Sequence, residues 1–378
     1  MRSAEGRAAS KSRAGWPAGR RLRDASSAGR SAPPARRAAA EWRAAGARGL
    51  GRVAPLETNR RLDGPWLPHC ATRSTAGVLR LFSRDAIGGF GSVSEGTVII
   101  IGGAEDKVRD RVILNRFVSL AGGTDARIMV ISTASSLGAE AGERYRAIFT
   151  ELGVTSIRTL HAVTRAQANE EKTALIARDA TGIFLTGGNQ LRLSSTIGGT
   201  RLADAILDRF RHGAVVAGTS AGASAMSSHM IAFGASGATP KQRMAQIAAG
   251  LGVLPGVIVD QHFQQRNRLG RLLSLIAQNP SLLGLGVDED TAGVVGPDHV
   301  LEVIGRGSIT IVDGTTSETD AWEVRGHRPL MISNVVLHSL SSGYKFDLRR
   351  RERIASPPLR ALPRRALPGG VPGEAASS

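Results

Sequence analysis

The sequence predicts an α/β fold with a doubly wound, mostly parallel sheet that is flanked by helices. Between Ser94 and Leu348, short β-branched runs alternate with amphipathic segments. Continuous apolar runs of this kind suit strands that are buried on both faces. After Gly284 the runs become short and are separated by turns, which predicts a short antiparallel C-terminal edge in the same domain.

The predicted parallel strands share one pattern, an apolar run that stops at small or polar residues. They are Thr97–Ile101, Arg127–Ser132, Gly182–Thr186 and Gly213–Ala217. The intervening amphipathic stretches predict the helices Asp106–Leu120, Gly142–Leu152, Arg165–Arg178 and Arg201–Arg211. The predicted antiparallel edge includes His299–Ile304 and Ser308–Val312. In such sheets the chemistry lies at the carboxyl ends of the strands, so the residues after these runs are candidates for a site.

The charge of the chain is concentrated at its two ends. Residues 1–93 hold 18 Lys and Arg against 6 Asp and Glu, residues 349–378 hold 7 against 2, and the middle holds 24 of each. We therefore divide the chain into a disordered Arg/Ala/Gly/Ser-rich extension (1–93), a patterned domain (94–353) and a disordered Pro/Arg tail (354–378). The alternatives for the extension are a polycationic arm, a targeting peptide or a later start of translation.

Composition excludes several classes of site. The middle of the chain is neutral, so the net charge of +17 gives no reason to expect nucleic-acid binding by the domain. The single cysteine, Cys70, allows no intramolecular disulfide and no cysteine-based metal cluster, which fits a cytoplasmic setting. No run of about 18 apolar residues occurs, so no membrane span is expected.

A serine follows the apolar run Gly213–Ala217, within the segment Gly218–Gly222. Its small neighbours allow a sharp strand-to-helix turn that exposes the Ser220 hydroxyl, the arrangement known as a nucleophile elbow. The N–H of Ala221 then points toward an oxyanion formed at Ser220, aided by the positive start of the helix. A lone pattern of this kind is equally compatible with a tight turn that packs a helix onto a sheet, so the hypothesis needs a base and an acid.

His262 is the candidate base because it follows another apolar run, Val257–Val259, at a predicted strand end. The alternative is a surface or core histidine without a catalytic role. Three acids, Asp288–Asp290, follow the apolar run Leu283–Val287, and one of them would orient the imidazole. The pattern does not select among the three.

The chain order serine, histidine, acid differs from the orders of α/β-hydrolases, chymotrypsin-like and subtilisin-like enzymes. The order and the motifs resemble those of cyanophycinases, members of a serine peptidase family that also holds bacterial aspartyl dipeptidases. The resemblance implies a fold related to the class I glutamine amidotransferase domain. It covers about Gly96 to Arg350 and rests on the joint occurrence of Gly102–Lys107, Gly187–Gln190, Gly218–Gly222, Ser228–Ile231, Asp260–Arg271 and Asp288–Ala292.

The resemblance implies roles for individual residues. Ser220 matches the family's nucleophile, His262 its base and Glu289 its acid. The backbone N–H groups of Ala221 and of Gly188, in the Gly187–Asn189 loop, are implied as the oxyanion donors. The positions implied to surround a β-linked aspartyl unit are Gln190, Asp260, Gln261, Arg266, Arg268 and Arg271.

The three arginines also have a physical interpretation. Arg266, Arg268 and Arg271 lie within one to two turns of a helix expected to begin beside the base, where guanidinium forks can converge on a carboxylate. By spacing alone, an exposed basic helix face is the more common arrangement.

The resemblance implies a serine-type exopeptidase that hydrolyses cyanophycin (multi-L-arginyl-poly-L-aspartate) to β-Asp-Arg dipeptides through an acyl-enzyme. It implies no metal and no organic cofactor. The expected partners are the cyanophycin polymer or β-aspartyl peptides, with no nucleic acid and no membrane, and we expect a homodimer. The alternatives are an isoaspartyl or aspartyl dipeptidase on small peptides, a non-catalytic amidotransferase-like binding module, and a polyanion-binding protein acting through residues 1–93. Phe233 stands where the family is glycine-rich, so it is expected to narrow the mouth of the site.

Overall fold

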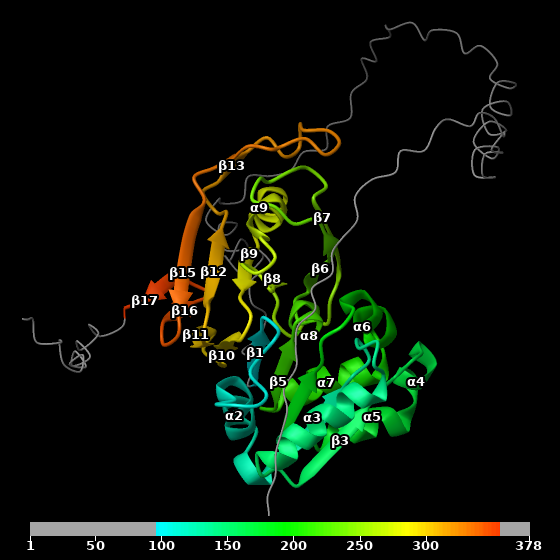
Figure 1. Ribbon diagram of the computed structural model, residues 1–378. Coiled ribbons are helices and arrows are strands. Elements are labelled where there is room, and N and C mark those ends of the chain that lie inside the picture. The colour runs from blue at the N-terminus through cyan, green and yellow to red at the C-terminus, as the bar shows by residue number, and fades with distance from the viewer. Residues whose placement is uncertain (1–95, 356–378) are drawn as a thin grey trace, which may run out of the picture. The chain divides into compact units, whose positions relative to one another are not determined.

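The computed structural model describes residues 96–355, and Figure 1 labels most of their elements. The predictions for residues 1–93 and for most of the tail lie outside these residues. Within the described range, a nine-stranded sheet has the order β17-β16-β11-β10-β1-β5-β4-β2-β3. Its strands are β1 (Thr97–Ile101), β2 (Arg127–Ile131), β3 (Ser156–Leu160), β4 (Gly182–Leu185), β5 (Val215–Thr219), β10 (Thr291–Val295), β11 (Val300–Gly305), β16 (Lys345–Asp347) and β17 (Glu352–Ile354).

The large sheet combines a parallel half and an antiparallel half. Strands β1, β5, β4, β2 and β3 pair in parallel. Antiparallel pairing joins β1 to β10 and continues through β11, β16 and β17. The predicted antiparallel C-terminal edge is therefore present, and β17 crosses the predicted domain boundary at residue 353.

Helices cover both faces of the parallel half. One core contains Ile99 and Ile101 of β1 together with α2 (Val112–Leu120) and α3 (Ala139–Glu151), and η3 (Gly123–Asp125) follows α2. The neighbouring residues Val98 and Ile100 belong to a second core on the opposite face. The helices on that side are α4 (Arg165–Asn169), α5 (Glu171–Arg178), α6 (Gln190–Ile197), α7 (Arg201–Arg211) and α8 (Ala221–Ala225). Because successive strand residues point to opposite faces, this division confirms the predicted doubly wound sheet.

A second sheet of four strands has the order β15-β12-β9-β8 (Figure 1). Strands β8 (Val257–Gln261) and β9 (Leu283–Val287) pair in parallel, while β12 (Ser308–Asp313) pairs antiparallel with β9 and with β15 (Val336–Ser341). One face shares the core of the large sheet, and α9 (Leu269–Gln278) packs on the other. The remaining strands form two hairpins, β6 (His229–Gly234) with β7 (Ala245–Ala249), and β13 (Glu318–Thr319) with β14 (Ile332–Ser333).

The structure differs from the expected elements in several places. The single helix expected over Arg165–Arg178 is divided into α4 and α5, because the backbone is extended at Glu170. Ser308–Val312 was expected in the antiparallel edge, but β12 lies in the second sheet, where Ile311 enters the shared core and Val312 packs on the α9 side. The helix expected from Asp106 begins only at Val112, because the Asp106 carboxylate accepts hydrogen bonds from four successive backbone N–H groups, those of residues 108–111.

None of the helices between residues 96 and 355 combines the length and the apolar character that crossing a membrane requires.

We expect a chain shortened to residues 94–355 to unfold cooperatively and to keep the activity of the full chain. Both sheets and their cores lie within this interval, so the shortened chain keeps the buried apolar contacts described above. Circular dichroism during a thermal melt, compared with the full chain, tests this expectation. A broad, non-cooperative melt of the shortened chain would contradict it.

Candidate active site

Ser220 lies on the turn that joins β5 to α8, as the elbow hypothesis requires. Its backbone has φ 52° and ψ −111°, a conformation that a residue with a side chain rarely adopts. The flanking glycines make the turn possible. A Cβ on Gly222 would lie 2.4 Å from the Leu185 carbonyl oxygen, and a Cβ on Gly218 would lie 2.5 Å from the carbonyl carbon of Gly222.

Ser220, His262 and Glu289 form a continuous hydrogen-bonded chain. Ser220 Oγ lies 2.9 Å from His262 Nε2, and His262 Nδ1 lies 2.6 Å from Glu289 Oε1. Ser220 Oγ also lies 3.3 Å from Gln261 Oε1. Ser220, His262 and Glu289 thus have the relative positions of a catalytic triad, and of the three acids it is Glu289 that contacts the imidazole.

The other two acids of the segment have structural contacts. Asp288 is buried and accepts hydrogen bonds from the Gln264 N–H and from the N–H and hydroxyl of Ser308. Asp290 accepts from the Asp106 N–H and forms an ion pair with Arg306. Neither carboxylate replaces Glu289 beside His262.

Burial holds His262 in the neutral form that a base needs. Desolvation lowers the pKa of His262 below its usual 6.5, and the positive charges of Arg266 and Arg268 act in the same direction. The hydrogen bond to Glu289 and its negative charge oppose this shift. The imidazole is therefore ready to accept a proton at neutral pH, while Glu289 stabilises the imidazolium once it forms.

The end of β1 connects the three triad segments. The carbonyl of Ile101 accepts from the Ser220 N–H at 2.9 Å, that of Gly102 from the His262 N–H at 2.8 Å, and that of Gly103 from the Asp290 N–H at 2.9 Å. Three successive carbonyl groups therefore position Ser220, His262 and Asp290, the residue next to Glu289.

Two glycines are necessary at this position. A Cβ on Gly102 would lie 1.9 Å from the Asp288 carbonyl oxygen. Gly103 has φ 99°, and a Cβ there would lie 2.4 Å from the His262 ring. Gly102–Lys107 is one of the motifs on which the resemblance rests, and no direct role in the site was expected for it. Its position at the end of a predicted strand was the available signal for a direct role in the site.

The oxyanion candidates lie on two sides of Ser220. Ala221 is the first residue of α8, so its N–H has no acceptor within that helix. Gly187 packs against the nucleophile, with its ideal Cβ position 3.4 Å from Ser220 Cβ. Gly188 follows with φ 141°, and a Cβ there would lie 2.1 Å from the Ala134 carbonyl oxygen. The glycine loop and the start of α8 therefore both approach the nucleophile.

Arg268 and Arg271 bind a carboxylate that belongs to the protein itself. Asp260 is fully buried and accepts from Arg271 Nε at 2.6 Å, from Arg271 Nη2, and from Arg268 Nη1 at 3.3 Å. Burial lowers the pKa of Arg268 to about 10, and the negative charge of Asp260 opposes this shift. Arg268 Nε is buried without a hydrogen-bond partner among residues 96–355.

Arg266 differs from the other two arginines. It is exposed and lies on the turn between β8 and α9, since α9 begins at Leu269 rather than beside the base as expected. Its guanidinium forms no ion pair or hydrogen bond within the described part of the chain. Of the three predicted arginines, Arg266 is thus the one that is exposed and pairs with no carboxylate among the described residues.

Gln190 and Phe233 lie at the β6 side of the site. Gln190 Nε2 donates to the carbonyl oxygens of Ile231 at 2.9 Å and of Ala232 at 2.8 Å. Arg271 Nη1 donates to the carbonyl oxygen of Gly234 at 3.2 Å. Phe233 lies between these contacts, at an irregularity in the β6–β7 pairing, and is 55% exposed. Its backbone is held on both sides while its ring remains accessible.

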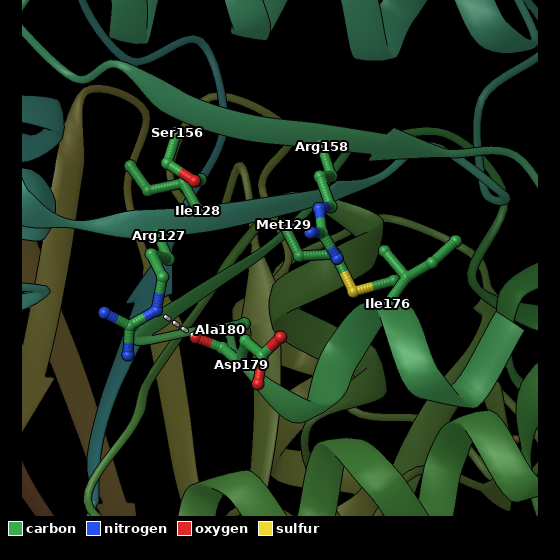
Figure 2. A pocket seen from close by; sticks show the side chains of 8 residues that line it. All are labelled: Arg127, Ile128, Met129, Ser156, Arg158, Ile176, Asp179 and Ala180. Atoms are coloured by element: carbon green, nitrogen blue, oxygen red, sulfur yellow. Dashed lines mark hydrogen bonds between the residues drawn. The ribbon is translucent and has the colours of Figure 1, made fainter. Parts of the chain in front are cut away.

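A separate pocket of about 170 Å³ lies at the other end of the parallel strands (Figure 2). Arg127 and Ser156, which line it, begin β2 and β3, whereas Ser220 follows the end of β5. Arg127 Nε donates to the Asp179 carbonyl oxygen at 2.6 Å. The pocket contains none of the predicted site residues. Its lining is Arg127, Ile128, Met129, Ser156, Arg158, Ile176, Asp179 and Ala180.

Comparison with known proteins shows the family of the chain. Residues 98–303 match the model of peptidase family S51, and these residues contain all three members of the triad. The chain belongs to peptidase family S51. It is therefore a peptidase, and the resemblance identified from the motifs is confirmed.

The relatives of this S51 peptidase cover most of its described residues. It is 44% identical over 261 residues to a cyanophycinase of Geminocystis herdmanii, and the aligned residues cover 68% of this chain and 96% of the relative. A cyanophycinase of Trichormus variabilis is 45% identical over 256 residues, or 67% of this chain and 86% of the relative. A crystal structure of a peptidase from an acI-B1 Actinobacterium shares the fold, with a TM-score of 0.51, 20% identity and coverage of 68% of this chain and 98% of that chain.

We expect the reactivity of Ser220 to depend on the protonation of His262, whose pKa lies below 6.5. Labelling of Ser220 by a sulfonyl fluoride requires neutral His262, so its rate stays high above the lowered pKa and falls as the pH drops through it. Glu289→Gln removes the interactions that raise the pKa and moves the midpoint further down, with a plateau rate lower by about two to four orders of magnitude. Arg266→Gln removes a positive charge that lowers the pKa of His262, so it moves the midpoint to higher pH.

Mass spectrometry of the labelled chain, at pH values across the acidic and neutral range, measures the midpoints of the wild-type chain and of both variants. A wild-type midpoint above 6.5, or a shift of both variants in the same direction, would contradict the assignment of the base and its neighbours.

Proposed function

We propose that this S51 peptidase is a serine-type exopeptidase that hydrolyses cyanophycin to β-Asp-Arg dipeptides through an acyl-enzyme. The observation that carries the proposal is the chain of two hydrogen bonds, 2.9 Å and 2.6 Å long, from Ser220 through His262 to Glu289. The relatives named cyanophycinase, at 44–45% identity, support the choice of substrate.

The geometry supports a two-step reaction. Ser220 Oγ attacks the scissile carbonyl carbon while His262 Nε2 takes the hydroxyl proton. The N–H groups of Ala221 and Gly188 stabilise the oxyanion, and the imidazolium returns the proton to the leaving amine. Water, activated by the same imidazole, then releases the acyl group. None of these steps needs a metal or an organic cofactor.

The basic segment supports recognition of an aspartyl unit. Arg266 is exposed and lies close enough to the base for its charge to lower the pKa of His262. Arg268 and Arg271 surround Asp260 and leave this buried group of three residues with a formal charge of +1. We propose that Arg266 binds a carboxylate of the substrate, while Asp260, Arg268 and Arg271 fix the segment that carries it.

The remaining proposed contacts complete the pocket. Gln261 lies against the nucleophile, and Gln190 holds the β6 strand that carries Phe233. We propose that Phe233 narrows the mouth of the site, which would favour a chain end over the interior of a polymer. An aspartyl dipeptidase restricted to small peptides is the other outcome that a product analysis can give.

We also propose a cytoplasmic homodimer. The single cysteine supports a reducing compartment. Strand β3 lies at the edge of the nine-stranded sheet, with exposed Ser156 and Arg158, and offers a surface for a second copy. Light scattering during size-exclusion chromatography measures the oligomeric state.

We expect purified protein to release β-Asp-Arg from cyanophycin, and Ser220→Ala to lower the rate by several powers of ten with the fold intact. Alanine fits the elbow but supplies no nucleophile. Mass spectrometry of the products and a thermal melt of the variant test both statements. Turnover by the folded variant would exclude Ser220 as nucleophile, and cleavage of small β-aspartyl peptides without cleavage of the polymer would favour the dipeptidase.

We expect Arg266→Lys to lower kcat/KM on cyanophycin by roughly 10- to 100-fold, because an ammonium group keeps the charge but not the planar fork. Arg178→Lys is the matched control, since Arg178 lies in the last turn of α5, outside the triad segments. Steady-state kinetics of both variants decide the question. Equal kcat/KM in the two variants would remove Arg266 from substrate recognition without affecting the triad.

A further inference from the structure

A buried carboxylate, Glu105, lies beside the nucleophile elbow and takes no part in the proposed reaction. It follows the Gly102–Ala104 turn at the end of β1 and is 3% exposed. A carboxylate buried to this extent is costly unless its oxygens accept hydrogen bonds and a cation balances its charge. The partners of Glu105 therefore show what it holds in place.

Both carboxylate oxygens of Glu105 accept a hydrogen bond from a hydroxyl group. Oε2 accepts from Thr219 Oγ1 at 2.6 Å, and Oε1 accepts from the Tyr145 hydroxyl of α3. Lys107 Nζ lies 2.9 Å from Oε1 and donates to the Glu105 carbonyl oxygen at 3.1 Å. The negative charge is thus balanced by Lys107, which follows Glu105 by two residues.

Thr219 connects this carboxylate to the nucleophile. It is the last residue of β5 and immediately precedes Ser220, whose backbone has the unusual φ of 52°. A residue in such a conformation keeps it only where the surrounding structure fixes the chain on both sides. The Ser220 N–H is fixed by the Ile101 carbonyl, and the Thr219 side chain is fixed by Glu105.

The surroundings strengthen the contact. The Tyr145 ring packs against Phe184 with centroids 4.6 Å apart and against Phe149 with centroids 6.2 Å apart. Burial and the adjacent Glu105 raise the pKa of Tyr145 well above its usual range, so its hydroxyl remains a neutral donor. In this apolar environment, hydrogen bonds to a charged acceptor are strong and directional.

We infer that Glu105 is a positioning residue for the nucleophile. Through the Thr219 hydroxyl it fixes the strained backbone of Ser220 and so the 2.9 Å contact between Ser220 Oγ and His262 Nε2. Glu105 itself touches neither the substrate nor the transferred proton. The inference rests on the proposed role of Ser220 as nucleophile.

The test compares hydroxyl groups that bind the two oxygens of Glu105. Thr219→Val removes the hydroxyl toward the elbow and keeps the side-chain shape, whereas Thr219→Ser retains the hydroxyl. Tyr145→Phe is the matched control, because it removes the hydroxyl on the other oxygen and leaves the elbow contact in place. The readouts are the rate of Ser220 labelling by a sulfonyl fluoride, which needs no knowledge of the substrate, and the melting temperature of the full chain.

We expect Thr219→Val to label about tenfold more slowly than wild type, since a small misplacement of a reacting group has a large effect on rate. Thr219→Ser and Tyr145→Phe should remain within about twofold of wild type, even where Tyr145→Phe lowers the melting temperature as much as Thr219→Val. Glu105→Gln, which keeps the shape and removes the charge, should also slow labelling. Combined with Thr219→Val, it should slow labelling by less than the product of the two single effects.

Wild-type labelling rates in both Thr219→Val and Glu105→Gln would overturn the inference. So would a Tyr145→Phe variant that slows as much as Thr219→Val at an equal loss of melting temperature, because the contact would then be only structural. If Thr219→Val does not fold, Glu105→Gln and the serine variant decide alone. Absence of labelling at Ser220 in the wild-type chain would instead remove the proposed nucleophile, a result distinct from unchanged variants.

Discussion

The site depends on the backbone at the end of β1. The carbonyl groups of Ile101, Gly102 and Gly103 accept N–H groups from the segments that carry the nucleophile, the base and the acid. These segments come from three strands that are distant in the sequence, and β8 and β9 belong to a different sheet from β1 and β5. Backbone hydrogen bonds in a buried environment have little freedom in length and direction, so they fix the relative positions of the three segments before any side chain is considered.

This arrangement requires local strain. Ser220, His262 and Asp290 all have φ near 50°, and each of them donates its N–H to one of the three successive carbonyl groups at and just after the end of β1. Such conformations cost of order 1–3 kcal/mol each and persist where neighbouring contacts determine them. The hydrogen bonds that position these three residues are therefore also the contacts that maintain their strained backbone.

The charges near the base act together. Arg266 and Arg268 lower the pKa of His262, while Glu289 acts against them. The positive charges proposed to attract a substrate carboxylate thus act together with burial, the larger cause, to keep His262 unprotonated. Asp260 confines two of the guanidinium groups, and removal of such a buried partner typically costs about 3–5 kcal/mol, so their charges remain in a defined position.

The features that the sequence predicted are those determined by local patterns. The runs Thr97–Ile101 and Arg201–Arg211 coincide with β1 and α7, because apolar periodicity alone defines them. The order of Ser220 and His262 after two strand ends indicated a hydrolytic site, and the resemblance then selected Glu289. Pattern could not place β12 in the second sheet, because its apolar residues are compatible with either sheet.

The sequence pattern also could not predict which side chains contact one another. Spacing brings Arg266, Arg268 and Arg271 to one segment, but only the fold turns two of them onto Asp260 and leaves Arg266 exposed. The Asp106 carboxylate delays the start of α2 by binding backbone N–H groups, a competition that helical periodicity does not reveal.

Two carboxylates lie on either side of the nucleophile, and their different environments correspond to different tasks. The Glu289 side chain is 36% exposed and contacts His262, the proposed base, which must gain and lose a proton. The Glu105 side chain is 1% exposed and contacts hydroxyl groups and a lysine, none of which changes its charge in the reaction. A fixed charge in a dry environment holds geometry well, because nothing nearby screens it or competes for its hydrogen bonds. Glu105 is thus suited to holding the backbone of the elbow, and Glu289 to contact with the proposed base, because the fold buries the two carboxylates to different extents.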